Sequence, residues 1–371
     1  HCLLRRQRQM CIRDRNMRGC VFLFYLFCNL CIAQNSSRYS NEFLNIGVDA
    51  RSISMSNAVV SSTNDVNSTY WNPSGLINLE NDEISLMHAN YFANIASFNF
   101  ISYAKKIDDD SAFGASLIRF GVDDILDTTQ LIDNQGNINY DRIELFSAAD
   151  YAFLLSYARK NKLLNINYGI NAKVIRRIIG DFANSWGFGF DFGVQYKTDN
   201  GFMFGLMVRD ITTTYNSWSF DENRLNDIQN AISNQNQSVP EKAEITIPKM
   251  QLGLSKLFLV NRDYTLLAGL DLFILFEETN DILSTKNTSI NPSIGLEFGY
   301  IDLVYLRLGI GNFQNETEFD NSQNLTFQPN FGIGFNMRNL KVSYALTDIG
   351  NQSTALYSNI FSLKFNLDIL K

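Results

Sequence analysis

The chain has 371 residues, of which 45% are hydrophobic and 13% aromatic, with only five Pro. That length suits two soluble domains or one large β-barrel. All five Cys lie within the first 31 residues, and His88 is the only His beyond residue 1. These counts exclude Cys–His catalysis, Cys–His zinc sites and redox motifs from the rest of the chain. We therefore expect no cofactor and no metal.

The charge of the chain disfavours nucleic acid as a partner. The formal net charge is −7, and residues 1–33 hold six Arg against one Asp. The remaining residues therefore carry 25 bases against 37 acids, a formal charge of −12. Because an acidic surface repels phosphate backbones, the sequence predicts no nucleic-acid binding.

The N-terminal residues predict an exported protein. A short positive region at 17–19 precedes an apolar run at 21–30 and small residues before Gln34. We expect a signal peptide at 17–33 that is cleaved before Gln34. Residues 1–16 fit no leader pattern, so we expect them to be a non-genuine N-terminal extension.

Lipidation of Cys31 is the alternative fate of this leader. A lipoprotein signal needs a small residue before the Cys, whereas Leu30 is bulky. We therefore expect a mature chain without a thiol and without an attached lipid.

From residue 82 onward, apolar residues alternate with polar ones. In 186–197, aromatic residues and Val occupy the even positions, whereas Gly, Asp and Gln occupy most odd positions. Such a strand cannot pack inside a sandwich, because its apolar face must meet lipid and its polar face a lumen. The sequence predicts an all-β fold, a 14-stranded antiparallel transmembrane β-barrel at 82–371, with outer-membrane lipid around it. The expected strands lie near 82–91, 96–106, 111–120, 149–158, 164–177, 186–197, 201–210, 248–259, 264–276, 291–300, 303–312, 326–337, 340–348 and 357–369.

Short polar turns alternate with longer connections, above all 121–148 and 211–247. Short turns are typical of the periplasmic side, so we expect an outer-membrane protein with both termini in the periplasm. Ser219 and Glu222 form a capping box that predicts a helix in the second long loop. That helix would cover the barrel mouth or, alternatively, bind a partner or act as a gate.

Residues 34–81 lack the alternation and are expected to form an N-terminal hatch inside the lumen. A fourteen-stranded barrel is wide enough to need filling. Pro73 and Gly75 predict a turn, and Arg51 can bind carboxylates or carbonyls in a confined space. The residues expected to define the hatch are Gly47, Asp49, Arg51, Met55, Trp71, Asn72, Pro73 and Gly75.

Charged residues also recur on the predicted lumen faces. We interpret them as a carboxylate–base network that holds the hatch, and as the lining of a permeation path in the alternative. Because a lumen position can keep a charge hydrated, Gly193→Arg is expected to be tolerated better than Phe192→Arg. The network residues are Lys173, Asp191, Arg209, Asp271, Glu297 and Arg307.

Catalysis has little support in the sequence. Some barrels hydrolyse lipids with a Ser–His pair, and His88 is the sole candidate base. A lone His within a strand is more typical of a structural or interfacial role. We therefore expect no enzymatic activity.

The run from Gly47 to Arg51, with Met55 following, and the run Tyr70-Trp-Asn-Pro-Ser-Gly-Leu76 resemble the PorV/PorQ family of outer-membrane proteins. Ser56 departs from the Gly usual after the Met. The resemblance implies a barrel of the FadL-like superfamily that binds translocon or secreted cargo proteins in type IX secretion. FadL-like relatives pass hydrophobic small molecules, and such transport is the alternative function.

Overall fold

The computed structural model describes residues 40–367, apart from 133–134, 223–241, 318–321 and 348–357. The predicted signal peptide, the extension before it and most of the predicted loop helix lie outside the described residues. Within the described part of the chain, no helix is both long and apolar enough to span a bilayer.

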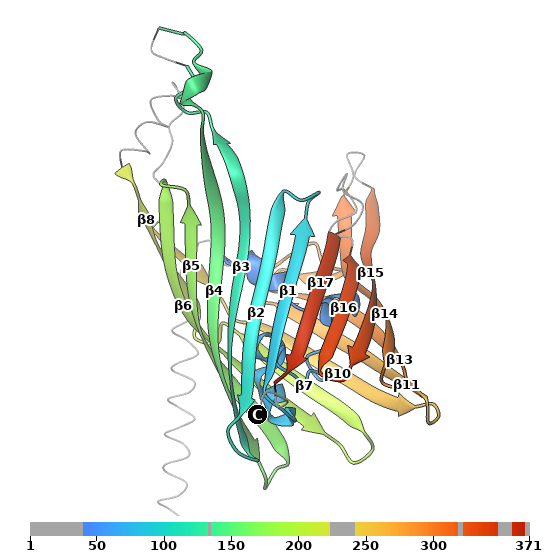
Figure 1. Ribbon diagram of the computed structural model, residues 1–371. Helices are drawn as coiled ribbons and strands as arrows, with labels where there is room; N and C mark the ends of the chain where they lie inside the picture. The colour runs from blue at the N-terminus through green and yellow to red at the C-terminus, as the bar shows by residue number, and fades with distance from the viewer. Residues whose placement is uncertain (1–39, 133–134, 223–241, 318–321, 348–357, 368–371) are drawn as a thin grey trace, which may run out of the picture. The chain divides into compact units, whose positions relative to one another are not determined.

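Strands make up most of the described chain (Figure 1). They are β1 (Glu83–Tyr91), β2 (Ala96–Lys106), β3 (Ser111–Asp127), β4 (Glu144–Asn161), β5 (Ile166–Ile179), β6 (Ala183–Lys197), β7 (Phe202–Arg209), β8 (Thr214–Phe220), β9 (Ala243–Thr246), β10 (Lys249–Leu259), β11 (Tyr264–Leu275), β12 (Leu283–Thr285), β13 (Thr288–Tyr300), β14 (Val304–Thr317), β15 (Gln323–Met337), β16 (Leu340–Thr347) and β17 (Ser358–Asn366).

These strands close into one antiparallel barrel. β17 pairs with β1 and so removes the free edge that an open sheet would expose. β7 and β8 both pair with β6, so together they form one barrel strand with a break. β10 pairs with β7 and β9 pairs with β8, so β9 and β10 together form the neighbouring strand, which is broken as well. β12 is a short hairpin strand that pairs with β13. Counted in this way, the described residues form the predicted 14-stranded barrel.

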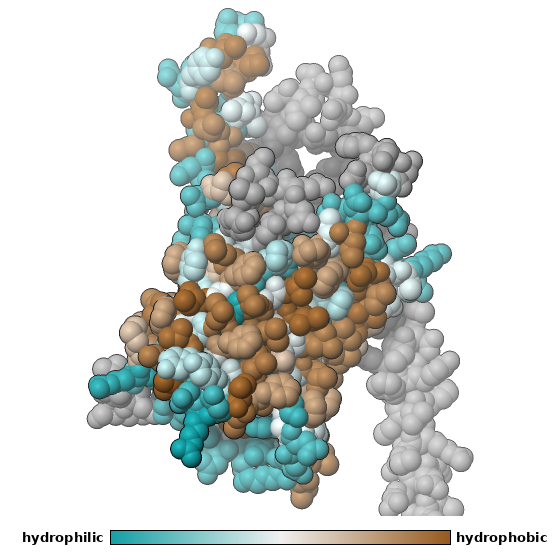
Figure 2. All heavy atoms as spheres, turned by 90° about the vertical axis from the view of Figure 1, so that its right-hand side faces the viewer, coloured by the Kyte–Doolittle hydropathy of each residue, from teal (hydrophilic) through white to brown (hydrophobic). Residues whose placement is uncertain are grey.

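The two faces of the wall follow the alternation in the sequence. On β6, Trp186, Phe188 and Phe190 point outward and are exposed, whereas Ser185 and Asp191 are buried. Figure 2 shows hydrophobic side chains gathered on the middle of the wall, with hydrophilic ones above and below. An apolar belt of this kind is the surface that a barrel presents to the bilayer.

Part of the expected loop at 211–247 is strand. β8 and β9 extend the wall into it, and Ser219 pairs with Asn184 on β6 rather than capping a helix. At the break between β7 and β8, the backbone turns through Asp210 and Thr213, whose φ angles are 56° and 62°. The alternation of β8 is short, which is why the sequence alone did not separate it from a loop.

The hairpin of β3 and β4 reaches beyond the neighbouring strands (Figure 1). The two strands have 17 and 18 residues, and their register shifts between Val122 and Ile125. A short helix, η3 (Tyr140–Arg142), lies in the connection. Leu126, Leu145 and Tyr140 are exposed there, so the extension carries apolar side chains outside the belt.

Residues 40–81 form a compact segment inside the barrel (Figure 1). Almost all of its side chains from 47 to 77 are buried. On one side, an apolar core joins segment residues such as Val48 and Trp71 to wall residues such as Phe98 and Ile118. The segment contains η1 (Glu42–Asn45), α2 (Ala50–Ser54), α3 (Ser68–Trp71) and η2 (Pro73–Asn78).

Candidate functional site

The N-terminal segment lies against wall glycines on strands around the barrel. A Cβ atom added at any of nine wall glycines would lie 2.1–2.9 Å from an atom of the segment. Real Cβ contacts are almost never that short, so these positions require the smallest residue. The glycines are Gly114, Gly169, Gly193, Gly205, Gly253, Gly269, Gly295, Gly309 and Gly332.

The segment follows the inner wall in reverse strand order. Ser54 meets β15, Met55 meets β14 and β13, and Ala58 meets β11. Ser61 then meets β10 and β7, and Asn72 meets β6. The Gly positions that alternate with aromatic residues in the sequence therefore form the inner surface against which this segment packs.

Asn72 fastens the segment to two strands. Its side-chain amide donates to the carbonyls of Val194 on β6 (3.1 Å) and Leu206 on β7 (3.3 Å), and to Val60 within the segment. Its Oδ1 accepts from the backbone and hydroxyl of Ser74 and so caps η2, which Pro73 begins. Alanine at position 72 would leave buried carbonyls without this donor.

Arg51 joins the segment to β13. Its Nε and Nη2 donate to the Glu297 carboxylate at 2.8 and 3.0 Å. Arg307 on β14 donates to the same carboxylate at 2.6 Å and to the Ser343 hydroxyl. One carboxylate therefore bridges two guanidinium groups, which makes Glu297 the centre of the group.

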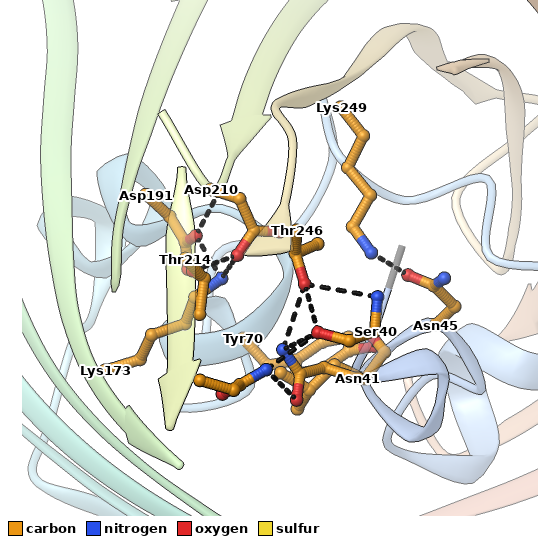
Figure 3. Close-up of polar contacts among 12 residues, drawn as sticks. Ser40, Asn41, Asn45, Tyr70, Lys173, Asp191, Asp210, Thr214, Thr246 and Lys249 are labelled. Carbon is orange, nitrogen blue, oxygen red and sulfur yellow. Dashed lines mark hydrogen bonds and ion pairs between the residues drawn. The ribbon is translucent and has the colours of Figure 1, made fainter. Parts of the chain in front are cut away.

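A second group lies at the break between β7 and β8 (Figure 3). Lys173 Nζ lies 2.7 Å from Asp191 and 2.5 Å from Asp210. Asp191 also accepts the backbone N–H of Asp210, and Thr214 donates to the Asp210 carboxylate. The group fixes the backbone where the strand is interrupted.

The remaining two network residues do not join these groups. Asp271 accepts from the Val60 N–H (3.0 Å) and from Gln251 (3.0 Å). The Arg209 guanidinium stacks over Tyr70 at 4.3 Å. The predicted single network is therefore, in the structure, two ion clusters and two separate contacts with the segment.

The other expected hatch residues occupy tight positions. Gly47 has φ +98°, and a Cβ there would meet Asn57 and Trp71. Asp49 has φ 71° and is buried. Met55 is fully buried, and Trp71 donates to the Val48 carbonyl at 3.0 Å.

Gly75 is equally confined, since a Cβ would lie 2.4 Å from the Thr63 carbonyl oxygen. The sequence reasoning missed Asp65, which forms an ion pair with Lys364 on β17. Asp210 was missed as well. Their alternation signal is weak, because Asp65 lies in irregular chain and Asp210 in a strand break.

A cavity of about 500 Å³ lies between the segment and the wall. Tyr70 and Trp71 of the segment line it together with Tyr91, Arg209 and Phe273 of the wall. Amides and hydroxyls make up much of the remaining lining: Asn45, Asn57, Gln251, Asn291, Asn312, Gln328, Asn330, Ser56, Ser293 and Thr347.

His88 lies on the exposed face of β1, where its Nδ1 is 2.8 Å from Asn99 Oδ1. The imidazole is thus hydrogen-bonded to an amide oxygen and not to a Ser hydroxyl. Among the described residues, no group of three or more His, Cys, Asp or Glu is arranged to hold a metal.

A sequence profile described as type IX secretion system protein PorV matches residues 33–206. The chain is a PorV-like outer-membrane barrel. The match spans the N-terminal segment and the wall from β1 into β7, and so includes the motifs that carry the resemblance. No curated protein matches the chain.

Solved structures similar to this PorV-like barrel have the same fold. The toluene transporter TodX of Pseudomonas putida is 12% identical, with a TM-score of 0.54, over 86% of this chain and 98% of that one. The CymD monoaromatic hydrocarbon channel is 10% identical, with a TM-score of 0.52, over 86% and 98% of the two chains. At these identities the likeness concerns the fold alone. The sequence match and the fold are those of an outer-membrane β-barrel.

Proposed function

We propose that this barrel serves type IX secretion by binding cargo or translocon proteins. The observation that carries the proposal is that residues 40–81 occupy the lumen and contact glycines on nine strands. A segment fastened through Asn72, Arg51 and Asp271 to the wall suits a scaffold better than an open pore. The PorV match over 33–206 supports the same function.

The extended β3–β4 hairpin supplies a surface for a protein partner. Leu126, Leu145 and Tyr140 are exposed on it, beyond the apolar belt. Exposed apolar groups of this kind favour protein contacts. Within the proposal, residues 34–81 act as the hatch, 82–371 form the barrel, and both termini lie in the periplasm with the hairpin outside.

Deletion of the gene in the native host tests the proposal. Cargo of the secretion system should accumulate in the periplasm, and the intact gene should restore secretion. Normal secretion together with failed growth on hydrophobic compounds would contradict it.

Transport of hydrophobic small molecules is the second candidate. The cavity of about 500 Å³ above the segment favours it, since that volume suits a small ligand. The fold likeness to TodX and CymD is consistent with it. The same deletion strain separates the two functions, because uptake and secretion are measured independently.

A further inference from the structure

Arg209 is a buried cation that has no acidic partner within the part of the chain that the structure describes. Its side chain is 6% exposed at the end of β7, and it lines the cavity. Its guanidinium lies 4.3 Å from the Tyr70 ring centre and 5.9 Å from that of Trp71. Among the described residues, no carboxylate or other acceptor is bonded to it, whereas Arg51 and Arg307 share Glu297.

Two further polar groups in residues that line this cavity also lack a hydrogen-bond partner among the described residues. The Tyr91 hydroxyl is unbonded in a side chain that is 1% exposed, and Asn57 Oδ1 accepts no hydrogen bond. Both residues line the cavity together with Arg209. Leaving a buried donor unpaired is costly, and leaving a charge unpaired costs more. The residues that line the cavity therefore include a guanidinium, a hydroxyl and an amide oxygen that have no partner among the described residues.

The acids of the lining are already engaged. Asn45 donates to Glu42 at 2.6 Å. Asp281 accepts from Thr279 and from Asn291, each at 2.7 Å. Neither acid is within ion-pair distance of Arg209. The charge of Arg209 is thus available to a ligand.

The rest of the lining suits an apolar body. Tyr70 and Trp71 present their rings, and Ile53, Phe273 and Leu275 add apolar side chains. A volume of about 500 Å³ accommodates a small molecule but not a folded protein.

We propose that this cavity binds a small organic carboxylate with a compact apolar body. The planar guanidinium of Arg209 matches a carboxylate, and the Tyr91 hydroxyl donates a further hydrogen bond. The apolar body packs against Tyr70 and Trp71. The proposal goes beyond the secretion function and does not depend on it. A carboxylate ligand fits this cavity better than a neutral hydrocarbon, because a hydrocarbon would leave Arg209 unpaired.

Calorimetric titration of the full barrel in phosphatidylcholine nanodiscs tests the proposal. The probe is 4-phenylbutyrate, and the matched neutral compound is 4-phenylbutan-1-ol. Wild type should bind the acid, and the alcohol should bind about tenfold to a hundredfold more weakly, as the loss of one charge-assisted hydrogen-bond pair implies. Arg209→Gln should reduce acid binding to the level of the alcohol without weakening alcohol binding.

Arg176→Gln is the matched control, because Arg176 also stacks on an aromatic ring, that of Trp186, but does so away from the cavity. It should bind the acid like wild type. Tyr91→Phe removes a single hydroxyl and should weaken acid binding several-fold, which keeps the test valid if Arg209→Gln does not fold. Equal affinities for acid and alcohol, no acid binding by wild type, or unchanged acid binding in Arg209→Gln and Tyr91→Phe would each overturn the proposal.

Discussion

A Cβ atom added at Gly193 on β6 would lie 2.1 Å from Oδ1 of Asn72 in the N-terminal segment. Asn72 Oδ1 is in turn held by Ser74, and Pro73 lies close behind it. The expectation that Gly193 would tolerate arginine better than Phe192 rested on a hydrated lumen at Gly193, and that premise is wrong. The assignment of Gly193 to the lumen is correct, but that part of the lumen is packed with protein.

Gly193→Ala is expected to destabilise the barrel. The methyl group must displace Asn72, and overpacking of this kind costs about 1–3 kcal/mol. The temperature at which the folded band is lost on semi-native gels should fall. Gly121→Ala is the control, because the nearest atoms to its Cβ are the flexible tip of Arg119. A Gly193→Ala barrel as heat-stable as the control would contradict the close contact.

The period-two pattern was sufficient to predict the barrel and its strand number. Trp186 and Phe188 identify the lipid face by themselves, because a transmembrane wall has no other place for exposed aromatic residues. The break between β7 and β8 was not predictable, since Asp210 interrupts the alternation for only a few residues. The ion pair between Asp210 and Lys173 at this break joins residues far apart in the sequence.

The candidate site was predictable in its residues but not in its contacts. Glycines opposite aromatic residues indicated a lumen face, yet not that each would touch a particular atom of the segment. Arg51 was expected to need a carboxylate, and only the fold identifies it as Glu297. Arg209 was assigned to a charge network, whereas it stacks on Tyr70, because alternation gives the face of a side chain but not its partner.

Arg51→Ala should loosen the segment and increase leakage of small ions. Glu297 keeps Arg307 in this variant, so the increase should be moderate. Glu297→Ala should leak more, because it leaves two guanidinium groups without their carboxylate, and removing one partner of a buried pair costs about 3–5 kcal/mol. Conductance in planar bilayers measures both. The reverse order, or wild-type conductance in both variants, would exclude Glu297 as the centre of the group.

The segment should lose stability in acid through Asp65. Burial alone would raise the pKa of this carboxyl, but the charge of Lys364 outweighs it and the pKa lies below its ordinary value. A lowered carboxyl pKa stabilises the fold above the unfolded pKa, and that stability is lost as pH falls through the folded pKa. Gel-shift temperatures should therefore drop as pH falls below the ordinary pKa of an aspartate, and Asp65→Asn should flatten this drop.

The contribution of Asp49 to stability should change with pH in the opposite direction. Burial, and next the charge of Asp65, raise the pKa of Asp49, so its contribution is present at low pH and is lost as pH rises through the folded pKa. Asp49→Asn should stabilise the barrel at neutral pH, and asparagine tolerates the φ of 71° at this position. A loss of stability in Asp49→Asn at neutral pH would show that its charge is needed.

The β3–β4 hairpin can be shortened without disturbing the wall. Ile125 and Phe146 pair directly, so residues 126–145, which include Leu126, Tyr140 and Leu145, can be replaced by an Asn-Gly turn. The shortened barrel should assemble with wild-type heat stability, because the removed residues lie beyond the closed sheet. A barrel that fails to assemble would show that the extension serves folding.

The most direct test of the secretion function is the amount of secretion-system cargo retained in the periplasm of a deletion strain complemented with the shortened barrel. The matched control is the deletion strain complemented with Arg209→Gln, a variant that alters the cavity but not the hairpin. We predict that cargo accumulates with the shortened barrel, as in the uncomplemented strain, and is secreted with Arg209→Gln. Normal secretion in the uncomplemented strain would contradict the function, and normal secretion with the shortened barrel would contradict the role of the hairpin.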